Sequence, residues 1–416
     1  MRFLIVTQYY PPEIGAPQVR LAAVTKTLVE MGHKVEVVTG MPNYPTGRIL
    51  TEYRRHFYTR EELNGYRIQR IWLYAAMGAG FRRMLNYLSF TFMVCVPLIR
   101  AGKPDVVLVE SPPPFVMLPV VFFNLFWRAK LILNVADLWP DSITQMGLMK
   151  EGITVNMIRI FERWCYRRAN YINGVTEGIR NSLIHSKKVP VEKVLFFPNG
   201  VDTVTFSPSE LDWKLASELG FDGKRVILYA GTLGYAQGLE VALQAMSQVA
   251  GQLPTVHLVF IGDGSECIEL TKMAKELMLN NVSFLRPQPP EYVARLYSIA
   301  LAGLASLKPL PIFEGARPSK IFPIMASGKP VIYSGAGEGA RLIQEADAGI
   351  VVKPGDASAL AAAIEYIVRN PEVAAKYGQN GRRFVERKLS WTKIVDDWLA
   401  QLENVNQPAA APKVNH

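Results

Sequence analysis

The chain has 416 residues, of which 49% are hydrophobic, and a formal net charge of +10. This length predicts two or three folded domains, and the composition excludes a disordered or fibrous chain. Its three cysteines, Cys95, Cys165 and Cys267, stand far apart without Cys-x-x-Cys or paired histidines at metal spacing, which argues against a disulfide framework or a zinc site and is consistent with a reducing compartment.

The positive charge is confined to the first half of the chain. Residues 1–200 hold 25 Lys and Arg against 14 Asp and Glu, whereas residues 201–416 hold 21 against 22. Such asymmetry indicates that the first half faces an anionic partner. No nucleic-acid motif accompanies the charge, and the basic half is also the more apolar one, so an anionic membrane surface or a lipid diphosphate is favoured over nucleic acid.

Strand-like and helix-like segments alternate along the first half. Arg2–Thr7 is a continuous apolar run that predicts a strand rather than a secretory signal. Gln18–Met31 has helical spacing. Alternation of this kind indicates βαβ units and a parallel sheet. The further strands predicted are Lys34–Thr39, Asp105–Glu110, Lys130–Val135 and Tyr171–Val175.

Two segments of the basic half are unusually apolar. Met84–Ile99 has 16 residues and two basic residues close on each side, which is shorter than the roughly 20 needed to span a bilayer. A helix lying in the membrane plane and a buried core helix both fit it. Phe115–Trp127 follows a proline run, as a crossover helix would, and is predicted to be core.

The second half restarts the alternating pattern after a turn-rich linker, Phe197–Ser209. Two Rossmann-like domains with parallel sheets facing an interdomain cleft are therefore predicted, with ligands at the carboxyl ends of the strands. Strands are expected at Arg225–Ala230, Val256–Gly262, Val282–Leu285, Ile299–Ser306, Pro330–Tyr333 and Ile350–Val352, and helices at Gly238–Ala250 and Glu266–Leu279.

The expected domains are residues 1–203 and 204–390. A final helix at about 391–405 is expected to cross back onto the first domain, and residues 406–416, which are low in complexity, are expected to be a disordered tail.

Glycine-bearing loops follow predicted strands in both halves. Gly15 and Ala16 lie between the first strand and the first helix, where small residues expose backbone N–H groups to a phosphate. By itself this loop is more typical of a plain turn, and it lacks the dinucleotide-binding glycine spacing. Gly231 repeats the arrangement in the second half, and Asp263 with Gly264 ends the next strand.

A compact group of anion-binding side chains is expected at Arg317, Ser319 and Lys320, just before the predicted helix Ile321–Ala326. Two cations and a hydroxyl beside a helix start suit a diphosphate, including one that leaves in a transfer reaction as negative charge develops on it. A solvated basic patch is the alternative interpretation.

Two carboxylates of the first half follow strand ends. Asp137 is a candidate for orienting or deprotonating an acceptor hydroxyl, and capping a helix that begins near Trp139 explains it equally well. Glu177 is the second candidate, with a first-turn helix acid as its alternative role.

The quoted segments together resemble a known enzyme family. YAGTLG, VFIGDG, RPSKIFPIMASGKPVI and AGIVVKPGD resemble the donor domain of retaining family-four glycosyltransferases of GT-B fold. YYPPEIGAP, VVLVESPPP, VADLWPDSI and FFPNGVD extend the resemblance to bacterial aminosugar transferases of surface-polysaccharide assembly, of the fucosamine and colanic-acid types. The likeness runs in order over about residues 1–405.

The resemblance implies site residues and partners. Around the donor it implies Gly15, Ala16, Gly231, Thr232, Gln237, Asp263, Gly264, Arg317, Ser319 and Lys320. It also implies a UDP-sugar or GDP-sugar donor, transfer of an N-acetylated aminosugar or deoxyaminosugar with retention and without a metal, and a polyprenyl-diphosphate-linked glycan acceptor. The place would be the cytoplasmic face of the inner membrane, with peripheral attachment. The missing Asp-x-Asp motif agrees with metal independence.

The chain departs from the family at two glutamate positions, occupied here by Gly315 and Pro323, and Gln237 stands where many members carry a basic residue. A catalytically silent protein that binds a nucleotide sugar as a partner subunit is therefore the second hypothesis. A nucleotide-sugar epimerase is the third, and it predicts turnover without acceptor.

Overall fold

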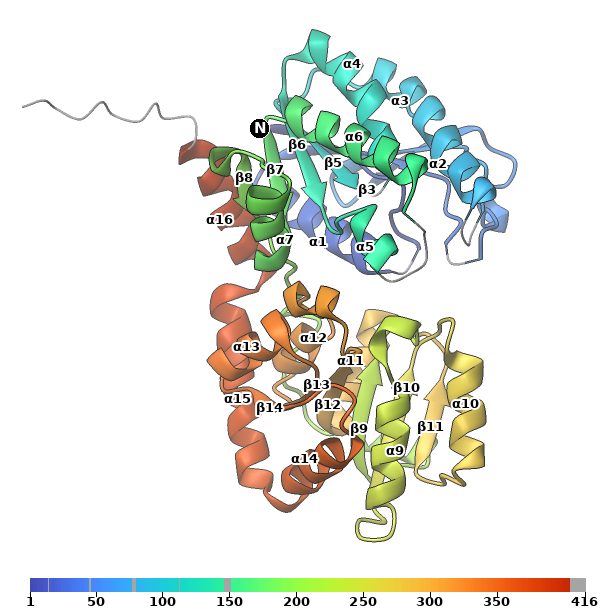
Figure 1. The fold of residues 1–416 in the computed structure, drawn as a ribbon, viewed down its shortest axis with the longest axis vertical. Helices are drawn as coiled ribbons and strands as arrows, with labels where there is room; N and C mark the ends of the chain where they lie inside the picture. The colour runs from blue at the N-terminus through green and yellow to red at the C-terminus, as the bar shows by residue number, and fades with distance from the viewer. Residues whose placement is uncertain (14, 45, 77–79, 112, 146–150, 405–416) are drawn as a thin grey trace, which may run out of the picture. The chain divides into compact units, whose positions relative to one another are not determined.

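The computed structural model describes residues 1–404 except 14, 45, 77–79, 112 and 146–150. The chain folds into two compact units (Figure 1). The first comprises Met1–Asn199 and the segment from Ile394 onward, and the second is Gly200–Lys393. The predicted disordered tail, residues 406–416, lies outside the described residues.

The first unit is built on one sheet with the strand order β3-β4-β2-β1-β5-β6-β7-β8. All neighbouring pairs are parallel except β3 with β4. Its central strands are buried on both faces, as expected for a parallel sheet covered by helices. The strands are β1 (Arg2–Val6), β2 (Lys34–Gly40), β3 (Tyr58–Leu63), β4 (Tyr66–Ile71), β5 (Val106–Ser111), β6 (Lys130–Val135), β7 (Tyr171–Gly174) and β8 (Val194–Phe196).

Helices connect these strands, and the last helix of the chain also belongs to this unit. In α16 the Trp398 indole donates to the Asn173 side chain at 3.0 Å and stacks on Phe197 with ring centroids 4.7 Å apart. The helices are α1 (Ala16–Glu30), α2 (Phe81–Met93), α3 (Cys95–Arg100), α4 (Met117–Trp127), α5 (Asp141–Gln145), α6 (Ile153–Arg168), α7 (Glu177–Asn181) and α16 (Trp391–Asn404), with short turns η1 (Thr51–Tyr53), η2 (Pro114–Val116), η3 (Ser182–Ser186) and η4 (Val191–Lys193).

The two apolar segments of this unit form helices that lie side by side (Figure 1). Met84–Ile99 is divided between α2 and α3, and it buries Phe90 and Leu98 while Phe92 remains 73% exposed. The prediction that Phe115–Trp127 is core was wrong for one face of α4. That helix buries Met117, Pro119, Val120 and Trp127 but exposes Leu118, Phe122, Leu125 and Phe126.

The hairpin of β3 and β4 was not predicted. Its turn is Asn64-Gly65, with φ values of 47° and 84°, and Asn-Gly is the residue pair that a two-residue hairpin turn prefers. β3 lies at the edge of the sheet, where charged side chains are common, so its sequence lacks the apolar run that predicts a strand.

The second unit contains a wholly parallel sheet with the order β11-β10-β9-β12-β13-β14. The predicted strands appear within about one residue of their expected bounds. They are β9 (Arg225–Ala230), β10 (Val256–Ile261), β11 (Val282–Leu285), β12 (Ala300–Ser306), β13 (Val331–Ser334) and β14 (Gly349–Val352). The helices are α8 (Trp213–Glu218), α9 (Glu240–Val249), α10 (Cys267–Glu276), α11 (Pro290–Ile299), α12 (Ile321–Ala326), α13 (Gly337–Glu345), α14 (Ala357–Arg369) and α15 (Pro371–Lys388), with turns η5 (Tyr235–Gln237) and η6 (Pro311–Gly315).

Among the described residues, every helix is too short or too polar to cross a lipid bilayer.

Candidate functional site

The loops after β9 and β10 lie against each other at the carboxyl edge of the second sheet. The Gly231 N–H donates to the Ile261 carbonyl at 2.8 Å, and the Leu233 N–H donates to the Asp263 carbonyl at 2.9 Å. A Cβ atom at Gly264 would collide with the Leu233 carbonyl. Glycine is therefore required for this close approach, and the paired loops form a fixed backbone surface.

Lys320 extends its side chain over this surface. Its Cε lies 2.6 Å from the position that a Cβ on Gly231 would take, and its Nζ lies 5.4 Å from the centre of the Tyr229 ring. Burial lowers the pKa of Lys320 to about 8. Within the part of the chain that the structure describes, its ammonium group has neither a carboxylate partner nor a hydrogen-bond acceptor. A cation that has lost water without gaining a partner is suited to binding an anion.

Arg317, three residues earlier, has a carboxylate partner. Its Nη2 lies 2.6 Å from Oε1 of Glu338, and the two side chains are only 12% and 6% exposed. Glu338 is the second residue of α13, and Gly337 before it has φ of +69° and lies against the Glu314 carbonyl. The pair fixes the direction of the guanidinium group.

Sequence reasoning did not identify Glu338 as a site residue. The available signal was an acidic residue directly after a glycine that follows a predicted strand, Pro330–Tyr333. That pattern places a carboxylate at the same carboxyl edge as the neighbouring loops.

Three other predicted donor residues of this unit form local contacts. The Gln237 Oε1 accepts from the Gly234 N–H at 3.1 Å, so its side chain shapes the turn η5. The Thr232 carbonyl accepts from the Tyr229 hydroxyl at 2.6 Å, and Thr232 is itself exposed. Asp263 is also exposed, and its Oδ1 accepts from the N–H of the next residue.

Ser319 lies in the turn before α12, and its carbonyl accepts from the Phe322 N–H at 3.3 Å. Gly231, Thr232, Gln237, Asp263, Gly264, Arg317, Ser319 and Lys320 all belong to the second unit, whereas Gly15, Ala16, Asp137 and Glu177 belong to the first.

In the first unit, a buried carboxylate organises the loop after β1. The Glu13 carboxylate accepts the N–H groups of Tyr10, Asn43 and Tyr44 at 3.1, 2.7 and 2.7 Å. Burial raises the pKa of Glu13 to about 7, although the three donors oppose that change. Gly15 follows as the N-cap of α1, and Ala16 is the first residue of that helix.

A buried cluster that sequence reasoning missed lies at the carboxyl ends of β5 and β6. Arg20 of α1 forms an ion pair with Glu110, and Asn134 donates to the same carboxylate at 3.0 Å. Asn199 accepts from Arg20 at 3.2 Å. Burial raises the pKa of Glu110, and Arg20 acts against this. The signal was a glutamate at the end of an otherwise apolar strand, VVLVES.

Asp137 and Glu177 lie after β6 and β7, as predicted. The Asp137 Oδ2 accepts from the Ser142 hydroxyl at 3.0 Å. Loss of water around the carboxylate raises the pKa of Asp137, although this hydrogen bond and one from the Leu138 N–H act to lower it. Glu177 is the first residue of α7, with Thr176 as the N-cap, and lies 3.4 Å from Arg180. By surface area, however, Asp137 is exposed and Glu177 is half-buried, so burial does not favour Asp137 over Glu177.

The described residues contain no group of three or more His, Cys, Asp and Glu side chains that could hold a metal ion. The polar groups at the carboxyl edge of the second sheet are instead suited to an anion.

Two protein families match successive parts of the chain. Residues 15–200 match the family described as glycosyl transferase 4-like domain, and residues 212–384 match glycosyl transferases group 1. A putative colanic acid biosynthesis glycosyl transferase, WcaI of Escherichia coli K12, is 26% identical over 412 residues, which cover 96% of this chain and 99% of that protein.

Solved structures of GT-B enzymes share the fold. Sucrose-phosphate synthase from Thermosynechococcus elongatus superposes with a TM-score of 0.73 at 19% identity, and the match covers 97% of this chain and 98% of that one. HepE of Anabaena, in complex with UDP-glucose, gives 0.72 at 18% identity, with 97% and 100% covered. These likenesses identify the two parallel-sheet units as a GT-B fold.

Proposed function

We propose that the chain is a GT-B glycosyltransferase with a 4-like domain followed by a group 1 domain. It transfers an N-acetylated aminosugar or deoxyaminosugar from a UDP-sugar to a polyprenyl-diphosphate-linked glycan. Transfer proceeds with retention and without a metal. The product belongs to a surface polysaccharide, an assignment supported by the likeness to the colanic acid protein.

The proposal depends most on Lys320. Its ammonium group is desolvated enough to lower its pKa to about 8, and it lies over the glycine backbone of the loop after β9. A donor diphosphate placed there accepts a charge-assisted hydrogen bond from Lys320. Its negative charge also stabilises the protonated form of Lys320, which burial disfavours.

The surrounding groups have complementary roles. Arg317, held by Glu338, binds the second phosphate, and Ser319 donates its hydroxyl. Gly231 and Gly264 let the diphosphate approach the backbone, Thr232 and Gln237 line that loop, and Asp263 lies toward the nucleoside. In the first unit, Gly15 and Ala16 at the start of α1 are candidates for contacting a phosphate.

In the transfer step, the bond between the anomeric carbon and the donor phosphate oxygen breaks, and a bond to the acceptor oxygen forms on the same face of the sugar. The acceptor proton passes to the leaving phosphate oxygen. Negative charge grows on the diphosphate as it leaves, so Lys320 and Arg317 stabilise the transition state more than the bound substrate. Asp137 orients the acceptor hydroxyl, and its raised pKa is compatible with hydrogen bonding in either protonation state. Glu177 is the second candidate for this role.

The acceptor requires access to a membrane surface. The outer face of α4 supports such contact, since Phe122, Leu125 and Phe126 are 57%, 65% and 70% exposed. Phe92 of α2 and Ile99 of α3 add to the apolar surface of these neighbouring helices. We assign peripheral attachment at the cytoplasmic face of the inner membrane to this surface, with the excess cations of residues 1–200 attracted to anionic lipid.

A thermal-shift panel of UDP-, GDP-, ADP- and dTDP-sugars tests donor binding. A donor at about 100 times its Kd adds about 2.7 kcal/mol to stability. We expect UDP-sugars to raise the Tm of the wild type but not of Lys320→Met. Lys329→Met is the matched control, because Lys329 lies at the other end of α12, also has a pKa lowered by burial, and donates to the Ser298 carbonyl.

Sugar transfer to lipid extracts then separates the enzyme from a silent partner protein. Donor binding without any transfer above the Lys320→Met level would contradict the catalytic proposal. Release of free UDP or an altered sugar without acceptor would favour the epimerase hypothesis.

A further inference from the structure

The first unit contains a groove of about 1090 Å³ that has no part in the proposed transfer. One wall is α6, and the other is the segment from the end of η3 through η4. Its charged lining comprises Arg159, Arg163, Arg167, Lys187, Lys188 and Lys193 against Asp141, Glu151 and Glu162. Cations therefore exceed carboxylates in a hollow large enough for a small molecule or a lipid headgroup.

The cations of α6 form a row. Arg159, Arg163 and Arg167 recur every four residues, so they lie on one helix face with a rise of about 6 Å from each to the next. Lys187 and Lys188 belong to the opposite wall. A ligand in the groove would thus be flanked by positive charge on both sides.

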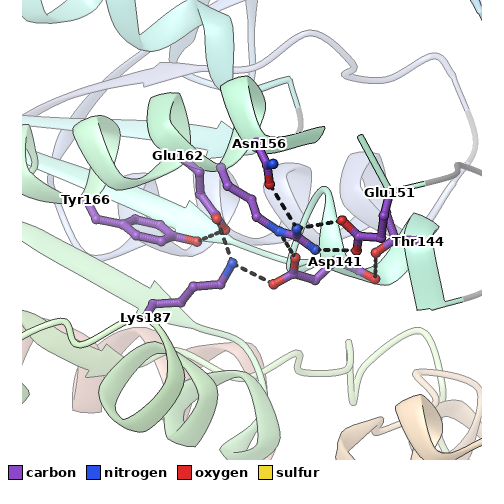
Figure 2. A network of polar contacts seen from close by, with 8 residues as sticks. Asp141, Thr144, Glu151, Asn156, Glu162, Tyr166 and Lys187 are labelled. Carbon is purple, nitrogen blue, oxygen red and sulfur yellow. Dashed lines mark hydrogen bonds and ion pairs between the residues drawn. The ribbon is translucent and has the colours of Figure 1, made fainter. Parts of the chain in front are cut away.

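The carboxylates of the groove are already paired (Figure 2). The Lys187 ammonium lies 2.6 Å from Asp141 and 2.7 Å from Glu162, and the Tyr166 hydroxyl donates to Glu162 at 2.7 Å. Arg159 binds Asp141 at 2.9 Å and Glu151 at 2.7 Å.

The pKa values agree with this pairing. Burial raises the pKa of Glu162, against the hydrogen bonds from Lys187 and Tyr166. Burial also acts to raise the pKa of Asp141, but its contacts with Lys187 and Arg159 outweigh that effect and lower it. The network thus pairs all three carboxylates with two cations, which leaves one net negative charge against the four other cations of the groove.

The remaining cations are left for a ligand. Arg163, Arg167 and Lys188 are exposed, and their side chains make no hydrogen bond or ion pair with the described residues. Lys193 donates only to the Arg167 and Ala169 carbonyls, which leaves its positive charge uncompensated. This part of the groove therefore has a positive potential that the protein itself does not balance.

We propose that this groove binds a phosphate-bearing ligand through Arg163, Arg167 and Lys188. Guanidinium groups bind phosphate oxygens in pairs, and two of them one helical turn apart fit a ligand with two phosphoryl groups or a lipid phosphate with a second polar group. Beside this row, Ile153, Met157 and Ile160 of α6 are 82%, 65% and 59% exposed. A soluble phosphate compound and a lipid headgroup both supply the required chemistry.

The test compares pyrophosphate with vesicles of phosphatidylglycerol or phosphatidylcholine, each added to the full chain. Hydrogen exchange locates the ligand, with protection expected in residues 153–168 and 186–193. This location distinguishes the groove from the donor site, whose loops lie near residues 231 and 263. Protection by pyrophosphate indicates a soluble ligand, and protection by phosphatidylglycerol vesicles alone indicates a headgroup.

The triple variant Arg163→Gln, Arg167→Gln, Lys188→Gln should weaken binding of the active probe at least about tenfold, because three charge-assisted contacts are lost. The matched control, Lys214→Gln, Lys272→Gln, Lys376→Gln, removes three exposed cations from the second unit and should bind as the wild type does. The proposal is overturned if the groove variant binds both probes normally, if both variants weaken equally, or if neither probe protects the groove. Its failure would leave the assignment of Lys320 to the donor untouched.

Discussion

The Lys320 side chain lies directly on Gly231, so close that a Cβ on this glycine would stand 2.6 Å from the lysine Cε. Gly231 also has φ of +140°, a conformation that residues with a side chain rarely adopt. The two residues belong to segments almost ninety positions apart, and the glycine backbone fixes where the ammonium group can lie.

Replacing Gly231 by Ala should therefore cost about 1–3 kcal/mol of folding free energy and displace Lys320. Donor affinity should fall at least about tenfold, which calorimetric titration with a UDP-sugar would measure. Gly251→Ala is the control, because no atom lies within 4 Å of the Cβ that it would add. Equal donor affinity in the Gly231 variant and the wild type would refute the packing argument.

Lys320→Met should stabilise the ligand-free protein by on the order of 1 kcal/mol while it strongly weakens donor binding. The folded pKa of Lys320, about 8, lies below its ordinary value of 10.5, so its burial destabilises the charged form. The gain from Met should be complete below pH 8 and should fade as pH rises from 8 to 10.5, because the wild-type lysine then becomes neutral in the folded state. Urea denaturation across this range measures the effect, and a gain that grows with pH would contradict it.

Donor binding by the wild type should also depend on the charge of Lys320. Affinity for the diphosphate should be constant below pH 7.5 and should decline above pH 8, as the lysine of the free protein loses its proton. The Lys329→Met control should show the same decline, whereas Lys320→Met should bind weakly at every pH.

Glu338→Ala should destabilise the second unit by about 3 kcal/mol, because it removes the carboxylate that Arg317 contacts and leaves a largely buried cation. The double variant Arg317→Met, Glu338→Met should recover part of this loss while it still fails to bind the donor. Thermal melts of the wild type, Arg317→Met, Glu338→Met and the double variant form the cycle that tests the coupling. Strictly additive single effects would show that the pair is not coupled.

Glu13 should make the free energy of unfolding fall as pH rises, whereas Lys320 should make it rise. Its folded pKa of about 7 exceeds the ordinary value of 4.5, so the folded protein holds a proton more tightly than the unfolded chain. This contribution to stability is complete below pH 4.5 and is lost as pH rises through 7. Glu13→Gln should abolish that dependence, which denaturation at pH 5 and pH 8 would reveal. Its overall stability should also be lower, because an amide cannot accept all three N–H groups at once.

Phe122→Ser with Phe126→Ser should reduce sedimentation with vesicles at least about tenfold, since two exposed aromatic side chains of α4 lose their contact with the acyl region. The exposed Ile268 of the second unit provides the control variant, Ile268→Ser. If the α4 variant sediments as the wild type does, the membrane face lies elsewhere.

Local patterns of the sequence were enough to predict most of the two sheets. Apolar runs such as Lys130–Val135 and Arg225–Ala230 became β6 and β9 with the same bounds, because strands buried on both faces need continuous hydrophobicity. The edge strand β3 is charged and does not need continuous hydrophobicity, so the Asn64-Gly65 pair was the one local pattern that indicated its hairpin. The same limit applies to α4, since composition does not reveal which face of an apolar helix lacks a neighbour.

The sequence by itself determined most of the strands and helices, the glycine loops at strand ends and the cationic segment at Arg317 and Lys320, because each depends on residues close together along the chain. Tertiary structure alone decided that Glu338 pairs with Arg317, that Lys320 lies on Gly231 with no carboxylate partner among the described residues, and that Arg163, Arg167 and Lys188 line one groove. These relationships join segments that are far apart along the chain. Burial, which shifts the pKa of each group and sets how strongly its charge interacts, arises only when those segments pack together.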